Sequence, residues 1–337
     1  MKIKPIKIEN IEKSDNLDFE SFIVGGETID KDLEDFVEGR MIPGYTLGID
    51  CLDDFFVFKK FELYGLVGKK GKGKTTINQA LQVAHSVANN LIWVVAFQEN
   101  SEWSMKLNYM NYVLCDFAKD VKKRNRELYY KASKWVDDHF IFLKVESVKE
   151  ALETTKYIID EKGIDVHAVF IDPINSFDSG YYNTGNSHQD MVNTSKKMLN
   201  FAKDVCSVHV SQHPTVSAQR EDADVNSYQA EGGSILNKAH FTYAINRDSG
   251  SSVNRISIDN VRNRHTGGNE TAKDNPVILN WSPTKIGLGS LLEGVKEENI
   301  IHNLKVFYDP FKENLEKKES YKVENIMPED AFGDCPF

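Results

Sequence analysis

The sequence has little of what marks secreted, membrane-spanning or zinc-stabilised proteins. Its 337 residues include four cysteines, at positions 51, 115, 206 and 335, and no two of them form a Cys-x-x-Cys pair. Such isolated cysteines predict reduced thiols in a cytoplasmic protein, not a disulfide framework or a zinc site. No apolar run is long enough to cross a membrane. The first 40 residues hold eleven Asp or Glu and a single arginine, which is unlike a signal peptide or a mitochondrial transit peptide.

An excess of positive charge is also missing. The net charge is −10, and residues 1–40 and 293–337 each carry eleven acidic and six basic side chains, so residues 41–292 are neutral. Binding to nucleic acid needs only a locally positive surface. The charge balance therefore neither predicts nor excludes a nucleic-acid partner.

Apolar segments alternate with helical patterns through the middle of the chain, which predicts an α/β fold. Strands are expected at 61–67, 91–97, 166–174, 205–211, 241–246 and 253–261, with helices at 75–84 and along a charged stretch at 103–135. This alternation favours a mostly parallel twisted sheet with helices on both faces.

Three regions follow from these patterns. Residues 1–42 form an N-terminal segment, residues 43–292 a core domain, and residues 293–337 an acidic, partly disordered tail. The N-terminal segment contains a predicted amphipathic helix at 28–41, with Thr28 as its cap and Gly39 at its end. Its apolar side chains share one face and need a partner, either their own domain or a neighbouring subunit: Ile29, Leu33, Phe36 and Val37.

One motif predicts a nucleotide site. The segment from Gly68 to Thr75 fits G-x-x-x-x-G-K-[ST], and it lies between a predicted strand and a predicted helix, as a phosphate-binding loop requires. Glycines let backbone N–H groups approach the phosphates of ATP or another nucleoside triphosphate. Lys74 would reach the β- and γ-phosphates, and the Thr75 hydroxyl would bind Mg²⁺. The residues assigned to the nucleotide are Gly68, Lys69, Lys70, Gly71, Lys72, Gly73, Lys74, Thr75 and Thr76.

Polar side chains at the ends of three other strands complete a candidate catalytic site. Asp172 ends an apolar strand and could hold Mg²⁺ directly or through water. Glu99 follows another strand and could orient and deprotonate the attacking water. Gln212 or His213 could hydrogen-bond the γ-phosphate, and the sequence does not distinguish between them. A late arginine, Arg262, could stabilise transition-state charge on a phosphate bound by another subunit.

These pieces, in this order, resemble the hexameric replicative DNA helicases of the DnaB, Twinkle and phage primase–helicase family. The resemblance covers roughly residues 43–285 and rests on the phosphate loop and five further segments: 44–53, Asp172-Pro173-Ile174-Asn175, Gln212-His213-Pro214, 231–248 and 261–267. No primase domain precedes the core in this sequence.

The resemblance implies a RecA-like core and a ring, usually a hexamer, with ATP sites between subunits. It implies ATP-driven movement on single-stranded DNA in the 5′ to 3′ direction, in replication of phage or plasmid type. Glu99 would be the catalytic glutamate and Arg262 the trans-acting arginine. The family usually has a lysine two positions before that arginine, where this chain has Asn260, and Arg264 is the candidate to replace it.

Two further sets of contacts are implied by resemblance. DNA would be held by segments 178–188 and 215–233, with Gln219 and Arg220 as the best single candidates. The last eight residues resemble the acidic tip of bacterial single-stranded-DNA-binding proteins, so Asp334, Pro336 and Phe337 would contact a replication partner.

Two other functions share the same motifs. A RecA-like ATPase could coat or pair DNA strands without unwinding them. A nucleotide-gated adaptor could recruit replication partners with little turnover. The set Glu99, Asp172 and Arg262 favours the helicase over both.

Overall fold

The computed structural model describes residues 26–40, 44–46, 53–213, 233–248, 250–251, 253–262, 267–272, 275–281, 288–290, 298–299 and 310–311. The chain divides into two compact units, one of residues 1–42 with 321–337 and one of residues 43–320. The predicted DNA contacts Gln219 and Arg220, the second arginine Arg264 and the C-terminal tip Asp334, Pro336 and Phe337 lie outside the described residues.

In the first unit, helix α1 covers Gly26–Val37. It begins two residues before the predicted start, so Thr28 lies inside its first turn and is not its cap. The end agrees with the sequence: Gly39 has a φ of 67° and its N–H donates to the Phe36 carbonyl at 3.0 Å. The four apolar side chains of the predicted face are exposed: Ile29, Leu33, Phe36 and Val37.

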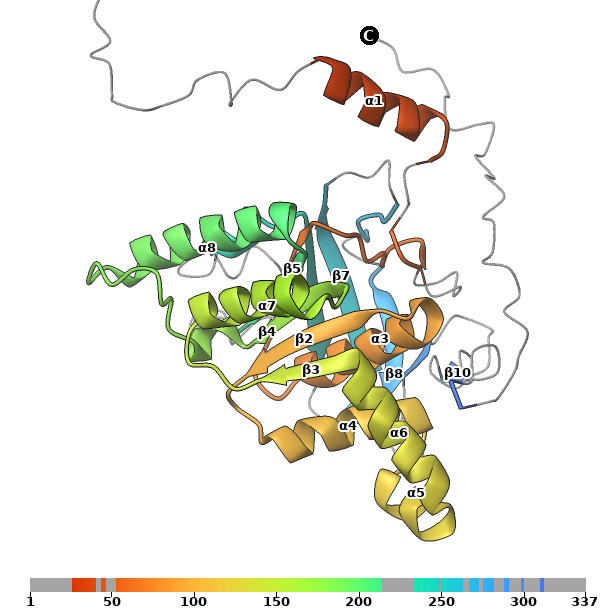
Figure 1. The fold of residues 1–337 in the computed structure, drawn as a ribbon. Coiled ribbons are helices and arrows are strands. Elements are labelled where there is room, and N and C mark those ends of the chain that lie inside the picture. The colour runs from red at the N-terminus through yellow and green to blue at the C-terminus, as the bar shows by residue number, and fades with distance from the viewer. Residues whose placement is uncertain are drawn as a thin grey trace, which may run out of the picture. The chain divides into compact units, whose positions relative to one another are not determined.

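The second unit is built on one sheet, which contains ten strands among the described residues (Figure 1). Their spatial order is β10-β9-β8-β7-β6-β1-β5-β4-β2-β3. The strands are β1 (Leu63–Gly68), β2 (Ile92–Phe97), β3 (Phe140–Leu143), β4 (Val166–Asp172), β5 (Ser207–Gln212), β6 (Phe241–Arg247), β7 (Val253–Val261), β8 (Val277–Trp281), β9 (Leu288–Ser290) and β10 (Glu298–Asn299).

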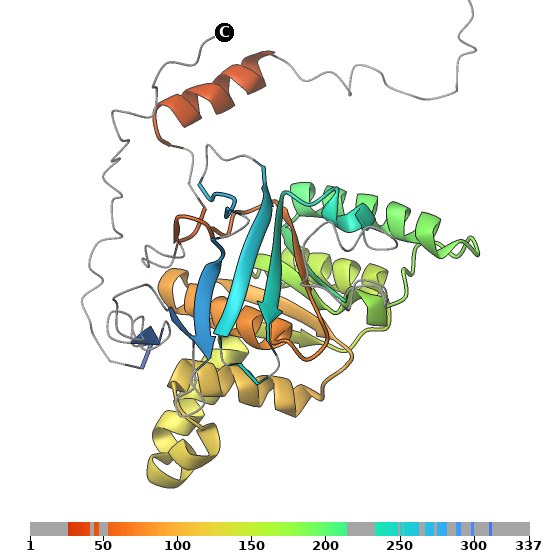
Figure 2. The ribbon, with the colours of Figure 1, turned by 180° about the vertical axis from the view of Figure 1, so that it is seen from behind.

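The sheet has a parallel part and an antiparallel part. Strands β3, β2, β4, β5, β1 and β6 run parallel, and β7 to β10 continue the sheet as an antiparallel meander. Figure 2 shows the antiparallel strands, in cyan and blue, together on one side of the sheet. The short strand β10 falls within the region 293–337.

Alternating side chains of the parallel strands feed two cores, one on each face of the sheet. Trp93 and Val95 of β2 belong to one core, which also holds apolar residues of α3 (Lys74–Asn89) and α4 (Glu102–Leu114). Val94 of β2 belongs to the other core, with residues of α7 (Val148–Lys162) and α8 (Ser187–Asp204). Because both faces are covered, the parallel strands are apolar nearly throughout. The remaining short elements are η2 (Ile174–Ser176) and α9 (Gly233–Leu236).

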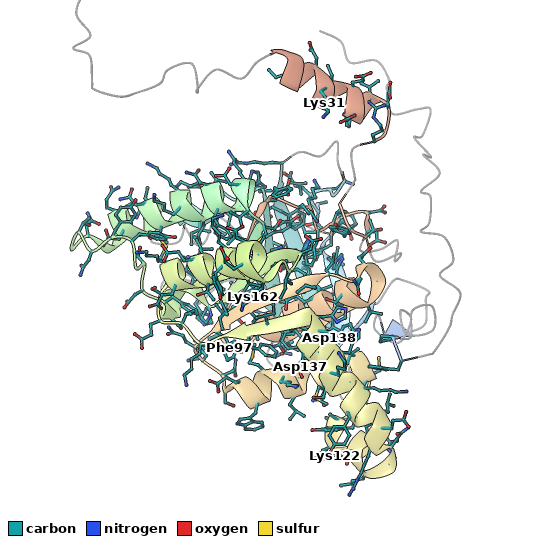
Figure 3. All side chains as sticks on the ribbon, in the orientation of Figure 1. Lys31, Phe97, Lys122, Asp137, Asp138 and Lys162 are labelled. Carbon is teal, nitrogen blue, oxygen red and sulfur yellow. The ribbon has the colours of Figure 1, made fainter. Side chains whose placement is uncertain are left out.

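The charged stretch expected as one long helical region is three helices. They are α4, α5 (Ala118–Arg124) and α6 (Arg126–His139). Cys115 ends α4 in the left-handed region, with a φ of 50°, and Asn125 is extended between α5 and α6. Helical periodicity continues across both breaks, so the sequence pattern did not reveal them. In Figure 3, Lys122 marks the α5 end of this group, far from Phe97 on the central strand β2.

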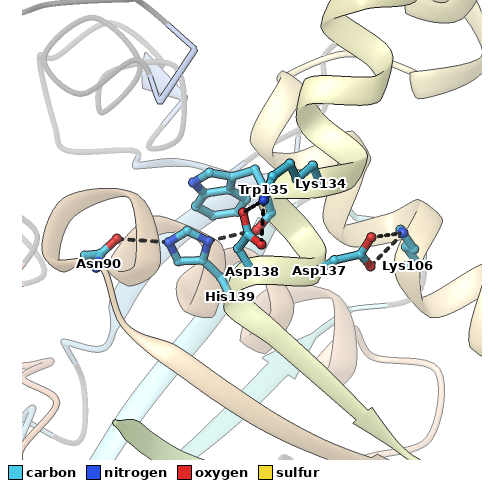
Figure 4. Close-up of polar contacts among 7 residues, drawn as sticks. All are labelled: Asn90, Lys106, Lys134, Trp135, Asp137, Asp138 and His139. Atoms are coloured by element: carbon cyan, nitrogen blue, oxygen red, sulfur yellow. Dashed lines mark hydrogen bonds and ion pairs between the residues drawn. The ribbon is translucent and has the colours of Figure 1, made fainter. Parts of the chain in front are cut away.

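Polar contacts fasten α6 to the neighbouring helices (Figure 4). The His139 ring lies 3.1 Å from Asn90 Oδ1 at the end of α3 and 2.8 Å from the Trp135 carbonyl oxygen. Lys106 of α4 reaches both carboxylate oxygens of Asp137, at 2.6 and 2.7 Å. The ends of α3 and α6 are thus tied together beside the sheet.

Candidate nucleotide-binding site

The phosphate loop leaves the central strand β1 and enters α3, as the sequence predicts. Gly71 and Gly73 adopt φ values of 73° and 93°, a region that L side chains rarely occupy. A Cβ on Gly68 would lie 2.8 Å from Lys74 Cγ and 2.9 Å from the Ile245 carbonyl oxygen. Glycine at these positions lets the loop fold tightly at the start of α3, where free backbone N–H groups attract anions.

Lys74 is buried beneath the loop. Its Nζ lies 2.9 Å from His213 Nδ1 and 3.3 Å from the Lys69 carbonyl oxygen. Burial lowers the pKa of Lys74 to about 8, although Asp172 and Glu99 act in the opposite direction. An ammonium group with so little hydration is suited to bind a phosphate.

Thr75 and Asp172 form a pair of oxygen donors. The Thr75 hydroxyl donates to Asp172 Oδ2 at 2.8 Å, across 97 positions of sequence. Burial raises the pKa of the Asp172 carboxyl, and the hydrogen bond from Thr75 and the charge of Lys74 counteract this. The described residues contain no cluster of three or more His, Cys, Asp or Glu that would enclose a metal by itself. Mg²⁺ fits the pair nevertheless, because it prefers oxygen donors and takes its remaining ligands from water and substrate phosphates.

The ends of the parallel strands bring the other predicted groups to the same edge of the sheet. Strand β5 lies between β1 and β4, so His213, which follows β5, lies between the phosphate loop and Asp172. Its Nε2 is 3.4 Å from Glu99 Oε1, beyond the end of β2. Burial and the neighbouring Lys74 charge lower the pKa of His213, so its ring is neutral at pH 7.

The structure separates the two residues that the sequence left open. His213 contacts both Lys74 and Glu99, whereas Gln212 is the last residue of β5 and is buried beside β1. The Gln212 Oε1 atom has no hydrogen-bond partner among the described residues. Of the two, His213 is therefore the side chain that faces the phosphate-binding lysine.

Arg262 lies at the opposite edge of the sheet. It follows Val261, which pairs with Phe241 at the start of β6, whereas Gly68 pairs with Ile245 near the end of β6. Four steps along a strand, or about 13 Å, separate these positions. The Arg262 guanidinium donates to the Asn237 carbonyl oxygen at 2.8 Å. The structure thus does not bring Arg262 to the phosphate loop of its own chain.

Asn260, at the position where the resembling family has a lysine, faces inward. Its amide donates to the Ala239 carbonyl oxygen at 2.9 Å. The edge near it is basic: the neighbouring charges of Arg262, Lys203 and Lys59 add to burial in lowering the pKa of His240 to about 4.

Three contacts of the site were not assigned from the sequence. Arg247, at the end of β6, donates to the Gly71 carbonyl oxygen at 2.9 Å and so braces the loop. Asn175 Oδ1 accepts the His213 backbone N–H at 2.9 Å. The Thr76 hydroxyl hydrogen-bonds to the Tyr112 side chain, which leaves its backbone N–H as the group available to a phosphate. Arg247 ends a strand at the ligand edge, and that position was its only signal in the sequence.

Comparison with solved structures finds this fold at low sequence identity. The solved structure of one helicase ATPase domain matches with a TM-score of 0.63 and 14% identity, over 79% of this chain and 98% of that chain. A DnaB-like replicative helicase matches with a TM-score of 0.58 and 16% identity, over 77% of this chain and 65% of that chain. The RadB recombinase matches with a TM-score of 0.47 and 14% identity, over 74% of this chain and 100% of that chain.

We found no family model and no curated protein that matches the sequence. The structural matches establish the fold class: the chain has an α/β, RecA-like core, the fold of these helicase ATPase domains. The predicted fold is thus confirmed. In the part of the chain that the structure describes, no helix is long and apolar enough to cross a membrane.

Proposed function

We propose that this chain is an ATP-dependent DNA helicase of replicative type, which moves along single-stranded DNA as a ring, in the 5′ to 3′ direction expected from the resembling family. The observation that carries the proposal is the division of the site between two edges of the sheet. Lys74, Thr75, Asp172 and Glu99 meet at one edge, while Arg262 lies at the other. A ring in which the second edge of one subunit faces the first edge of the next would complete each site.

Within one subunit, each group has a distinct task. Lys74 binds the β- and γ-phosphates, and the loop N–H groups bind the remaining oxygens. Thr75 and Asp172 hold Mg²⁺, which neutralises phosphate charge when bound. Glu99, about half exposed, orients the attacking water and accepts its proton. The Arg262 guanidinium of the neighbouring subunit stabilises the charge that develops on the γ-phosphate.

DNA binding is assigned to segments that follow the ligand edge. Segment 178–188 is fixed at its start, because Asp178 bridges to Ser147 and the Val148 N–H donates to the Asp178 carbonyl oxygen at 2.8 Å. It then presents two neighbouring tyrosines, Tyr181 and Tyr182, of which the second is exposed. Aromatic rings stack on bases without regard to sequence. Gln219 and Arg220 remain candidates in the second segment.

The remaining assignments complete the proposal. The chain would divide into residues 1–42, 43–292 and 293–337 and would act in the cytoplasm, in replication of phage or plasmid type. Helix α1, with its exposed apolar face, would contact a neighbouring subunit of the hexamer. The tip residues Asp334, Pro336 and Phe337 would contact a replication partner.

The test is ATP hydrolysis with and without single-stranded DNA, followed by unwinding of a forked duplex. We expect DNA to stimulate hydrolysis, and Lys74→Ala to abolish both hydrolysis and unwinding. Stimulated hydrolysis without unwinding would instead support a strand-coating RecA-like ATPase. Slow turnover that ignores DNA would support a nucleotide-gated adaptor.

A further inference from the structure

His213 connects the two groups on which the proposed chemistry depends. Its Nδ1 is 2.9 Å from Lys74 Nζ, and its Nε2 is 3.4 Å from Glu99 Oε1. The backbone of His213 is fixed as well, since its N–H donates to Asn175 Oδ1 at 2.9 Å. The ring therefore lies between the phosphate-binding lysine and the carboxylate that would activate water.

The chemistry of the lysine determines where the ring proton lies. An ammonium group can only donate hydrogen bonds, so Nδ1 must accept from Lys74. A neutral imidazole then carries its proton on Nε2, which faces the Glu99 carboxylate. One neutral ring thus satisfies a cation on one side and an anion on the other.

We propose that His213 is an inhibitory bridge, which holds Lys74 and Glu99 together when no nucleotide is bound and which the incoming phosphates must displace. This inference rests on the proposed function, because it assigns regulation to the same site. Lys74 points toward His213 and the Lys69 carbonyl, and a phosphate competes with the ring for the ammonium protons. Once the ring leaves Lys74, its hold on Glu99 changes too, so phosphate binding is coupled to release of the carboxylate.

The bridge makes the site less receptive to nucleotide than an unbridged site would be. A hydrogen bond to a charged group contributes about 1.5–3 kcal/mol, and part of this is regained when a phosphate replaces the ring. Removal of the ring should therefore strengthen the binding of a nucleotide that uses Lys74. ADP is the appropriate probe, because it engages Lys74 through its β-phosphate and undergoes no hydrolysis.

The experiment measures the Kd of Mg-ADP by titration calorimetry for the wild type, His213→Phe and His213→Gln. Phenylalanine keeps the bulk of the ring without an acceptor, and we expect it to bind ADP about five- to tenfold more tightly. Glutamine offers Lys74 an amide oxygen and should bind ADP close to the wild type. A merely structural role for His213 would weaken ADP binding in both variants.

A second measurement keeps the test valid if His213→Phe folds poorly. In wild-type protein with ¹⁵N-labelled histidine, the His213 ring should show the tautomer protonated on Nε2, and Mg-ADP should shift the Nδ1 resonance. An Nδ1-protonated ring, or an Nδ1 resonance unchanged by ADP, would overturn the bridge. So would an ADP affinity in folded His213→Phe that is no tighter than that of the wild type.

These results are independent of the helicase assay. ADP binding requires neither hydrolysis nor DNA, so a chain that fails to unwind DNA can still show the expected Kd change. If the wild type binds no ADP, both the bridge and the proposed function are wrong.

Discussion

At the scale of single residues, the site combines one crowded glycine with side chains that lie far apart in the sequence. Thr75 and Asp172 are 97 positions apart, and Lys74 and His213 are 139 apart. Their meeting depends on strands that end at a common edge, so it follows from the parallel sheet. The phosphate loop itself is local, and its fit depends on the absence of a Cβ at Gly68.

Gly68→Ala tests that fit. The added Cβ would approach Lys74 Cγ and the Ile245 carbonyl to less than 3 Å, so Lys74 must move from its buried position. Overpacking of this kind costs about 1–3 kcal/mol, and we expect Mg-ADP binding to weaken about tenfold or more. The measurement is the Kd of Mg-ADP together with the thermal midpoint.

The matched control is Gly163→Ala at the end of α7. Gly163 has a φ of 66°, and a Cβ there would meet nothing within 4 Å. It should lose about 1 kcal/mol of stability through backbone strain while binding Mg-ADP as the wild type does. Equal ADP affinities in the two variants would show that crowding at Gly68 does not shape the loop.

At the scale of elements, the sequence predicted most of the parallel strands, because residues buried on both faces form continuous apolar runs. Strand β7 was predicted at 253–261 and is observed at Val253–Val261. The strand predicted at 166–174 ends at Asp172, because the chain turns into η2 after Pro173. Boundaries of this kind depend on tertiary contacts that periodicity does not encode.

The elements that escaped prediction are short or connect other elements. The single-residue breaks at Cys115 and Asn125 divide a continuous helical pattern into three helices. Strand β3 has only four residues, and its pairing with β2 defines it. The bracing of the loop by Arg247 was also beyond the sequence, since nothing local links position 247 to Gly71.

At the scale of the whole molecule, three buried histidines from different elements share one core. His85 of α3, His167 of β4 and His209 of β5 are each at most 2% exposed, and none of their ring nitrogens has a hydrogen-bond partner among the described residues. They pack against aromatic rings, as His209 does on Tyr64 with centroids 4.2 Å apart. Burial lowers the pKa of all three, that of His167 to about 3, with Lys60 as a further cause at His167.

This cluster predicts acid-sensitive stability. Because the folded-state pKa values lie below the ordinary 6.5, the unfolded chain binds more protons at lower pH. The stabilising contribution is complete above pH 6.5 and declines as the pH falls toward 3. Each histidine costs about 1.4 kcal/mol of unfolding free energy between pH 7.5 and 5.5.

Urea unfolding at both pH values, at fixed protein concentration, checks this expectation with His167→Phe. The variant should lose about 1.4 kcal/mol less than the wild type over the interval, because phenylalanine suits the aromatic surroundings and takes up no proton. His188→Gln, at an exposed position, is the control and should retain the wild-type dependence. A pH dependence of His167→Phe equal to that of the wild type would contradict the prediction.

The proposed ring makes the separation of Lys74 and Arg262 within one chain testable by subunit mixing. Lys74→Ala and Arg262→Ala should each be inactive alone, and loss of a trans-acting arginine lowers turnover by about 10³–10⁵. Arg262→Ala should still bind Mg-ADP, because its own phosphate loop is intact. In an equal mixture, about a quarter of the interfaces combine an intact Lys74 with an intact Arg262 from the neighbour, so DNA-stimulated hydrolysis should return. The control mixes Lys74→Ala with a chain carrying both substitutions, which assembles no complete site and should stay inactive. A mixture of the single variants that regains no activity would remove the reason for placing Arg262 in a shared site.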